Sequence, residues 1–191
     1  MKKKWFSKKK KDAVTLNVIV IGLDNAGKTT LLNKLKPEGV WFFILFSNAQ
    51  AQEQIIQPTQ GVDETVIESD SYTINCRDVS GASNYRSIWQ QYADNLNGII
   101  FVVDSSDNFR FSTAADELHA FLDLQSIKAK AIPVLVLANK NDMENCAPTS
   151  TIEEELCIDQ IHNHPVYVTS VSSYSPKEIL VAIDWLVERR A

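Results

Sequence analysis

The stretch Gly22-Leu23-Asp24-Asn25-Ala26-Gly27-Lys28-Thr29-Thr30 decides the fold of this chain. It follows the apolar run 16–21 and precedes a segment whose leucines recur with helical spacing. The pattern G-x-x-x-x-G-K-[ST] lets successive N–H groups and a helix N-terminus surround a phosphate, whereas an ordinary glycine-rich turn does not require the lysine and threonine. We therefore predict a phosphate-binding loop, the P-loop, between a strand and a helix.

Side chains in and after this loop carry a second prediction, a magnesium triphosphate site. Lys28 is expected to reach the β- and γ-phosphates, and the Thr29 hydroxyl to ligate Mg²⁺. Asp78 ends a later strand and is followed by Val79-Ser80-Gly81, so its carboxylate is expected to hold the ion through water while the Gly81 N–H faces the γ-phosphate. By itself Asp-x-x-Gly is better explained by a simple turn, and the upstream P-loop favours the metal site.

Length and charge indicate one domain with an asymmetric charge distribution. The chain has 191 residues and a net charge of −5. Seven lysines against Asp12 give the first twelve residues +6, which leaves −11 for the remainder. An acidic body argues against nucleic-acid binding. Three cysteines and a start without an apolar signal segment favour a cytoplasmic, soluble or peripheral protein, which we expect to be a monomer.

The basic arm, residues 1–12, has two interpretations. It is either a solvated tail or a membrane-surface anchor in which the lysines from Lys2 to Lys11 contact anionic lipid and Trp5 and Phe6 settle among the headgroups. We favour the anchor. Lys2 stands where N-myristoylation needs glycine, which excludes that modification for this sequence.

Residues 38–46 are unlike their surroundings. Residues 40–46 are seven consecutive apolar or aromatic residues between a helix end and a glutamine-rich segment. They are either a short buried strand, an exposed partner-binding or aggregation-prone patch, or the translation of a retained small intron. Sequencing the spliced transcript distinguishes the last alternative from the others.

The remaining chain alternates strands with helices. We expect a hairpin of strands at 62–69 and 72–78, further strands at 98–104, 132–138 and 166–169, and helices at 112–125, from a Thr151 cap, and from a Ser175 cap with Glu178 closing a capping box. This order predicts an α/β fold with a doubly wound sheet, in which ligands bind at the carboxyl ends of the strands.

A base-reading loop is predicted at Asn139-Lys140-Asn141-Asp142, directly after strand 132–138. The Asp142 carboxylate can accept both N–H groups of guanine's Watson–Crick edge, which adenine does not offer. The Asn139 amide can serve nearby acceptors, and the Lys140 stem can pack on the base. For these four residues alone, a polar helix-entry turn is an equally good explanation.

Two further predicted strands also end in polar residues. The segment Thr169-Ser170-Val171 follows the last strand, and we expect the Ser170 N–H to donate to the guanine carbonyl oxygen. Asp104 also ends a strand, and we assign it no chemistry beyond a turn.

Six motifs in order carry a family resemblance: GLDNAGKTT, Pro58-Thr59, DVSG, WQQY, FVVDSSD and NKND. Together they resemble the Arf and Arf-like small GTPases. The resemblance implies a P-loop NTPase fold with a six-stranded sheet, GTP or GDP with Mg²⁺ as cofactors, and exchange factors and effectors as partners. It also implies that Thr59 reaches Mg²⁺ and the γ-phosphate only in the GTP state, and that the hairpin 62–78 moves between states.

Shorter segments, among them NKLKP, SNAQ and AIDWL, most resemble the Arf-like subgroup that recruits the Bardet–Biedl coat, the BBSome, to ciliary membranes. Removing 38–46 restores the family's spacing, which favours the intron interpretation. The subgroup implies peripheral membrane association, at the ciliary base.

Departures from the family pattern limit these expectations. Ala82 stands where the family has the glutamine that orients the attacking water, so we expect weak GTP hydrolysis. Val62 and Arg77 replace two effector-facing aromatics, and Tyr92 is retained.

Three functional hypotheses follow. The first is an Arf-like guanine-nucleotide switch, and the second is a scaffold that holds nucleotide with little or no hydrolysis. The third, a P-loop phosphotransferase, is disfavoured by the NKND motif.

Overall fold

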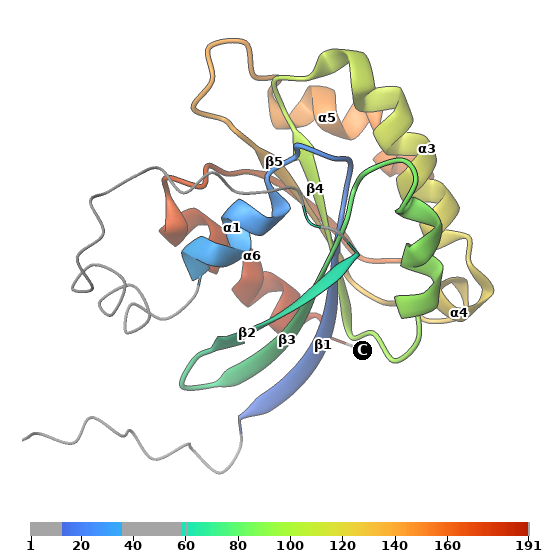
Figure 1. The fold of residues 1–191 in the computed structure, drawn as a ribbon, viewed down its shortest axis with the longest axis vertical. Helices are drawn as coiled ribbons and strands as arrows, with labels where there is room; N and C mark the ends of the chain where they lie inside the picture. Colours follow the sequence, from blue (N-terminus) through green and yellow to red (C-terminus); the bar gives the residue numbers. More distant parts are fainter. Residues whose placement is uncertain (1–12, 36–58, 60, 191) are drawn as a thin grey trace, which may run out of the picture.

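The computed structural model describes residues 13–35, 59 and 61–190, which form a six-stranded sheet between two helical layers (Figure 1). The strands are β1 (Val14–Ile21), β2 (Val62–Glu68), β3 (Tyr72–Val79), β4 (Gly98–Asp104), β5 (Val134–Asn139) and β6 (Val166–Ser170). Their order is β2-β3-β1-β4-β5-β6, and only the β2–β3 pair is antiparallel. The doubly wound α/β sheet predicted from the sequence is confirmed.

The helices divide between the two faces of the sheet. They are α1 (Lys28–Leu35), α3 (Phe111–Leu122), α4 (Gln125–Lys128), α5 (Thr149–Glu155) and α6 (Pro176–Glu188), with short 3-10 helices at Arg86–Tyr92, Asn108–Arg110 and Ile158–Gln160. Helices α1 and α6 lie on one face, and α3 and α5 on the other (Figure 1). Every residue of β4 and β5 is buried, because both faces of these central strands are covered.

The packing of β1 shows how the sequence pattern builds both layers. Alternate residues of a strand point to opposite faces, so Ile19 and Ile21 join the core under α3 and α5, while Leu16, Val18 and Val20 join the core under α1 and α6. All five are at most 1% exposed. The carboxyl end of β1 therefore holds the P-loop on a rigid, fully packed strand.

One helix start and one capping interaction differ from the prediction. Helix α5 begins at Thr149 with Pro148 as its N-cap residue, so the Thr151 cap was wrong. The main-chain bond from the Ala147 N–H to the Ser105 oxygen (2.7 Å) holds the chain just before Pro148, and the helix can start there. The predicted start of α6 is confirmed, because Ser175 is its N-cap residue and Pro176 its first residue. The Ser175 side chain makes no capping hydrogen bond, so only the predicted capping box was wrong.

The helix predicted at 112–125 ends earlier than expected. Helix α3 stops at Leu122, and Leu124 has extended dihedral angles (φ −56°, ψ 134°) before α4 begins. The extended residue breaks the i to i−4 hydrogen-bond series, so two helices replace one.

Several predictions fall outside the described residues: the basic arm at 1–12, the segment 38–46 and Pro58. Among the residues that the structure describes, no helix has the length and apolar character needed to cross a bilayer.

Candidate nucleotide-binding site

The P-loop curls back on itself between β1 and α1. Gly22, Asn25 and Gly27 have positive φ angles of 140°, 62° and 93°. Glycine adopts such angles without steric cost, and asparagine tolerates the left-handed region better than most residues. A Cβ atom on Gly27 would overlap the Asn139 side-chain amide, so this glycine also permits contact with the base-reading loop.

Lys28 is held inside this curl. Its ammonium donates to the carbonyl oxygens of Gly22 and Leu23, both at 2.9 Å, and the residue is 6% exposed. Burial lowers the pKa of Lys28 to about 8, although the Asp78 and Asp24 carboxylates act in the opposite direction. The loop therefore keeps a buried cation at its centre, where an anionic ligand would compensate the cost of burial.

Three oxygen-bearing side chains converge beside Lys28. Thr29 Oγ1 lies 2.8 Å from Thr59 Oγ1 and donates to Asp78 Oδ2 at 2.5 Å. Asp78 is 1% exposed and its Oδ1 has no hydrogen-bond partner among the described residues. Burial raises the pKa of Asp78, while the Thr29 hydroxyl and Lys28 oppose the rise. Hard oxygen ligands with an unsatisfied buried carboxylate oxygen fit Mg²⁺.

The segment after Asp78 lies directly on the P-loop. The Gly81 carbonyl oxygen accepts from the Asp24 N–H at 3.1 Å, and a Cβ atom on Gly81 would overlap the backbone of Gly22, Leu23 and Asp24. Arg86 Nε donates to the same Gly81 oxygen at 2.9 Å. Ala82 follows, half-buried, and contributes only a methyl group to this side of the site.

The predicted base-reading loop contacts the P-loop. Asn139 Nδ2 donates to the Ala26 oxygen at 2.8 Å, and the buried Asn139 Oδ1 has no partner among the described residues. Asp142 is exposed, and its Oδ1 accepts from the Ser172 hydroxyl at 2.5 Å. The structure thus brings the predicted base-reading residues and the P-loop together across a sequence separation of 113 residues.

Three residues of this site had no role in the sequence prediction. Asp104 accepts from Lys140 Nζ at 2.6 Å, so the assignment of a simple turn to Asp104 was incomplete. The Ser105 hydroxyl donates to the Asn139 carbonyl oxygen at 2.6 Å, and Ser172 holds Asp142. For Asp104 and Ser105 the signal was their place as polar residues at the carboxyl end of β4, and recognising it required knowing that β4 and β5 are neighbours.

Ser170 and Val171, which were predicted to contact guanine, differ in where their N–H groups point. The Val171 N–H donates to the Ala138 oxygen at 2.9 Å, so this group belongs to the sheet. Ser170 ends β6, opposite Ala138. In a parallel pair alternate residues bond to the same neighbour, so the Ser170 N–H points away from β5.

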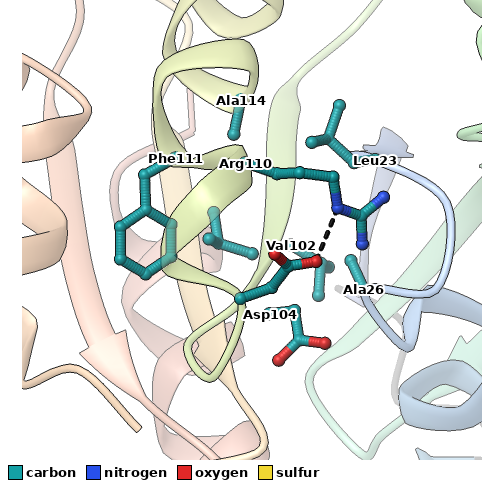
Figure 2. A pocket seen from close by; sticks show the side chains of 9 residues that line it. Leu23, Ala26, Val102, Asp104, Arg110, Phe111 and Ala114 are labelled. Atoms are coloured by element: carbon teal, nitrogen blue, oxygen red, sulfur yellow. Dashed lines mark hydrogen bonds and ion pairs between the residues drawn. The ribbon is translucent and has the colours of Figure 1, made fainter.

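A small pocket lies beside the P-loop, between the end of β4 and the start of α3 (Figure 2). Most of its lining is apolar, including Leu23, Val102 and Phe111. Arg110 crosses its edge, where the guanidinium donates to Asp107 at 2.6 Å and to Asp24 at 3.1 Å. This lining does not suit a triphosphate, and Arg110 instead ties α3 to the P-loop.

The fold and the site define a class of protein. A P-loop with a buried lysine, three converging oxygens and a loop carrying asparagine and aspartate at the adjacent strand end make this chain a P-loop guanine-nucleotide-binding protein.

The comparisons with known proteins identify the family. Residues 2–190 match the model of the ADP-ribosylation factor family. The chain is 35% identical over 185 residues to ADP-ribosylation factor-like protein 6 of Danio rerio, covering 97% of this chain and 92% of that protein. It is 32% identical to ADP-ribosylation factor-like protein 2 of Drosophila melanogaster, covering 90% and 85%. The chain belongs to the ADP-ribosylation factor family and is an Arf-like small GTPase.

A solved structure agrees with this assignment. The Arl6 BBS3 small GTPase from Trypanosoma brucei, with the bound nucleotide analogue GppNp, superposes with a TM-score of 0.79 at 28% identity. The match covers 92% of this chain and 96% of the other. The family therefore supports a guanine-nucleotide ligand and the effector and regulator proteins through which such switches act.

Proposed function

We propose that this protein is an Arf-like switch that binds GTP or GDP with Mg²⁺ and recruits effectors in membrane or ciliary trafficking. The observation that carries the proposal is the convergence of Thr29, Thr59 and Asp78 beside the buried Lys28. In this proposal these three residues hold Mg²⁺, which neutralises phosphate charge when bound. Thr59 is the switch threonine, because it comes from outside the P-loop and would report the γ-phosphate.

Each phosphate-side residue has a proposed role. The backbone of the segment 24–30 surrounds the phosphates, with Lys28 as the cation that contacts them. Gly81 is proposed to present its N–H to the γ-phosphate, and the contact of its backbone with Asp24 supports this role.

Each residue on the base side of the site also has a proposed role. Asp142 accepts from the guanine edge, Asn139 offers its remaining amide hydrogen to an acceptor of the base, and the Lys140 stem covers the base plane. Ser170 and Val171 close the site at the end of β6, with the Ser170 N–H as donor to the guanine carbonyl.

Titrations with mant-GTP, mant-GDP and mant-ATP test this function. We expect tight binding of both guanine nucleotides and weak binding of mant-ATP, because adenine lacks the two donors that Asp142 accepts. Asp142→Asn is expected to weaken GDP binding roughly a hundredfold and to admit xanthine nucleotides, since an amide can donate to the xanthine oxygen. A preference for ATP, or unchanged GDP affinity in Asp142→Asn, would defeat the proposal.

The likeness to the Arl6 BBS3 small GTPase of Trypanosoma brucei supports a more specific partner. On the resemblance of this chain to the BBSome-recruiting subgroup, the proposed effector is a BBSome-type coat at the ciliary base, and the proposed assembly state is a monomer. The basic arm, 1–12, is the proposed membrane contact, and the small GTPase domain spans 13–191 with 38–46 as an insertion. Flotation with phosphatidylserine vesicles tests the arm: replacing its seven lysines with glutamine should abolish flotation at physiological salt.

Ala82 favours a second candidate, a scaffold that holds nucleotide without turning it over. A methyl group cannot orient a water molecule, so Ala82 cannot replace the glutamine of the family pattern. A single-turnover assay with bound GTP separates the two functions. Hydrolysis at the rate of a competent small GTPase would exclude the scaffold, and persistence of GTP would select it.

A further inference from the structure

Asp104, at the carboxyl end of β4, is buried beside the base-reading loop. It is 8% exposed and lies opposite Asn139 in the register of the β4–β5 pair. Because these neighbouring parallel strands end at the same level, Asp104 stands one residue away from Lys140 across the sheet.

Both oxygens of the Asp104 carboxylate are occupied. Oδ2 accepts from Lys140 Nζ at 2.6 Å, and Oδ1 accepts from the Ser106 N–H at 3.0 Å and the Ser106 hydroxyl at 2.6 Å. The two Ser106 bonds fix the orientation of the carboxylate, so its other oxygen points at a definite position. A charged acceptor held in this way fixes the lysine more firmly than a freely rotating one.

Lys140 needs this support. Its φ angle is 66°, a left-handed conformation that lysine seldom adopts, and its side chain is 27% exposed. An unanchored lysine has many rotamers and loses entropy when one is selected. With Nζ bound to Asp104, the aliphatic stem is already restricted before a ligand arrives.

The neighbouring residue, Ser105, binds the same loop through separate hydrogen bonds. Ser105 donates to the Asn139 carbonyl oxygen twice, from its hydroxyl at 2.6 Å and from its N–H at 2.9 Å. The end of β4 therefore holds two consecutive residues of the base-reading loop, one through the backbone and one through a side chain.

We propose that Asp104 is a positioning residue that fixes the Lys140 stem over the plane of the bound base and thereby slows nucleotide release, without reading which purine is bound. This inference rests on the proposed guanine-nucleotide function and adds a residue to that site. Asp104 contacts the loop and not the ligand, so its effect passes through Lys140.

Dissociation of mant-GDP, chased with excess GDP, measures this effect in the full chain. Asp104→Asn removes the charge that holds Lys140, and we expect dissociation about tenfold faster. Lys140→Met keeps most of the stem and loses the charge, and should also accelerate release. The double variant should release no faster than Lys140→Met alone, because Asp104 has no further route to the ligand.

A matched control and a base-selectivity readout complete the test. Asp123→Asn breaks a comparable lysine hydrogen bond, to Lys128 at 2.7 Å, at the far end of α3, and should leave mant-GDP release unchanged. Because stacking does not depend on the 2-amino group, Asp104→Asn should accelerate mant-GDP and mant-IDP equally, whereas Asp142→Asn should change their ratio.

The outcomes separate this inference from the proposed function. Wild-type release rates in Asp104→Asn, or additive effects in the double variant, would overturn the inference while leaving guanine binding intact. Failure of the wild-type protein to bind mant-GDP would defeat the proposed function itself. If Asp104→Asn does not fold, the double variant leaves no lysine charge unpaired, and release faster than that of Lys140→Met alone would still overturn the inference.

Discussion

The proposed base side of the site, at residues 139–142, and its proposed γ-phosphate side, around Asp78, differ in how completely they are built. On the base side each reading side chain has its own support: Asn139 bonds to Ala26, Lys140 to Asp104 and Asp142 to Ser172. On the γ-phosphate side the oxygens of Thr29, Thr59 and Asp78 converge. Ala82 carries only a methyl group and offers no hydrogen-bonding side chain there.

This difference indicates that nucleotide binding and nucleotide hydrolysis depend on different groups. Binding needs complementary donors, acceptors and charge, which both sides supply. Hydrolysis also needs a group that orients water in the transition state, and rate enhancement comes only from interactions made there. If both proposals hold, we expect this protein to stay in its GTP state until another protein acts on it.

The largest expected effect comes from breaking the contact between the two sides. Gly27→Ala places a Cβ atom on the Asn139 amide and imposes a φ of 93° on alanine. We expect the free energy of unfolding to fall by about 3 kcal/mol, from left-handed strain and the lost Asn139 bond together. Urea unfolding measures the loss, and mant-GDP titration should show binding lost as well.

Gly61→Ala is the matched control for that variant. Gly61 has a similar φ of 87°, but a Cβ atom there meets nothing within 4 Å among the described residues. It should cost only the strain, about 1–2 kcal/mol. Equal losses in the two variants would show that the contact between Gly27 and Asn139 adds nothing.

The second-largest expected effect concerns the proposed γ-phosphate side, at Ala82. Ala82→Gln supplies a side chain that can orient water, and we expect single-turnover GTP hydrolysis to rise roughly tenfold to a hundredfold. Ala82→Leu, which adds bulk without hydrogen-bonding groups, is the control and should leave the rate unchanged. No increase with glutamine would mean that the hydrolytic side lacks more than this one group.

The smallest effect concerns acid stability on the base side. Burial acts to raise the pKa of Asp104, but hydrogen bonds from Lys140 and Ser106 outweigh it, and the net pKa lies below the ordinary 3.8. A carboxylate with a lowered pKa stabilises the folded state above its unfolded pKa and loses that contribution as pH falls through the folded value.

We therefore expect the difference in unfolding free energy between wild type and Asp104→Asn to stay constant from about pH 8 to 5 and to shrink below about pH 4. Urea unfolding across this range measures it. A difference that already shrinks at pH 6 would show that the Asp104 carboxylate is not held by Lys140 as described.

The parts of the site that were predictable from sequence are local. The P-loop lies within nine consecutive residues, and Asn139, Lys140 and Asp142 lie within four, so spacing alone indicates their chemistry. Strand positions were also predictable, because buried central strands are continuous apolar runs.

The supporting residues could not be predicted because they act across the sheet. Asp104 meets Lys140 over 36 residues of sequence, and Ser172 meets Asp142 over 30. Strand order and register decide which loop a polar strand end faces. A short sequence motif specifies neither of them. The predicted start of α5 was wrong for a related reason, since this start follows a backbone bond to Ser105 that no capping pattern contains.

The hydrogen bond from Asn139 to Ala26 links the proposed base-reading loop to the P-loop, so we expect the two halves of the ligand to bind interdependently. Guanosine and pyrophosphate, added as separate fragments, should each bind more tightly in the presence of the other, because ordering one loop orders its partner. We expect the same link to act in reverse: a protein that pulled the P-loop away from Asn139 would also disturb the proposed base pocket, so loosening one end of the nucleotide would favour release of the whole.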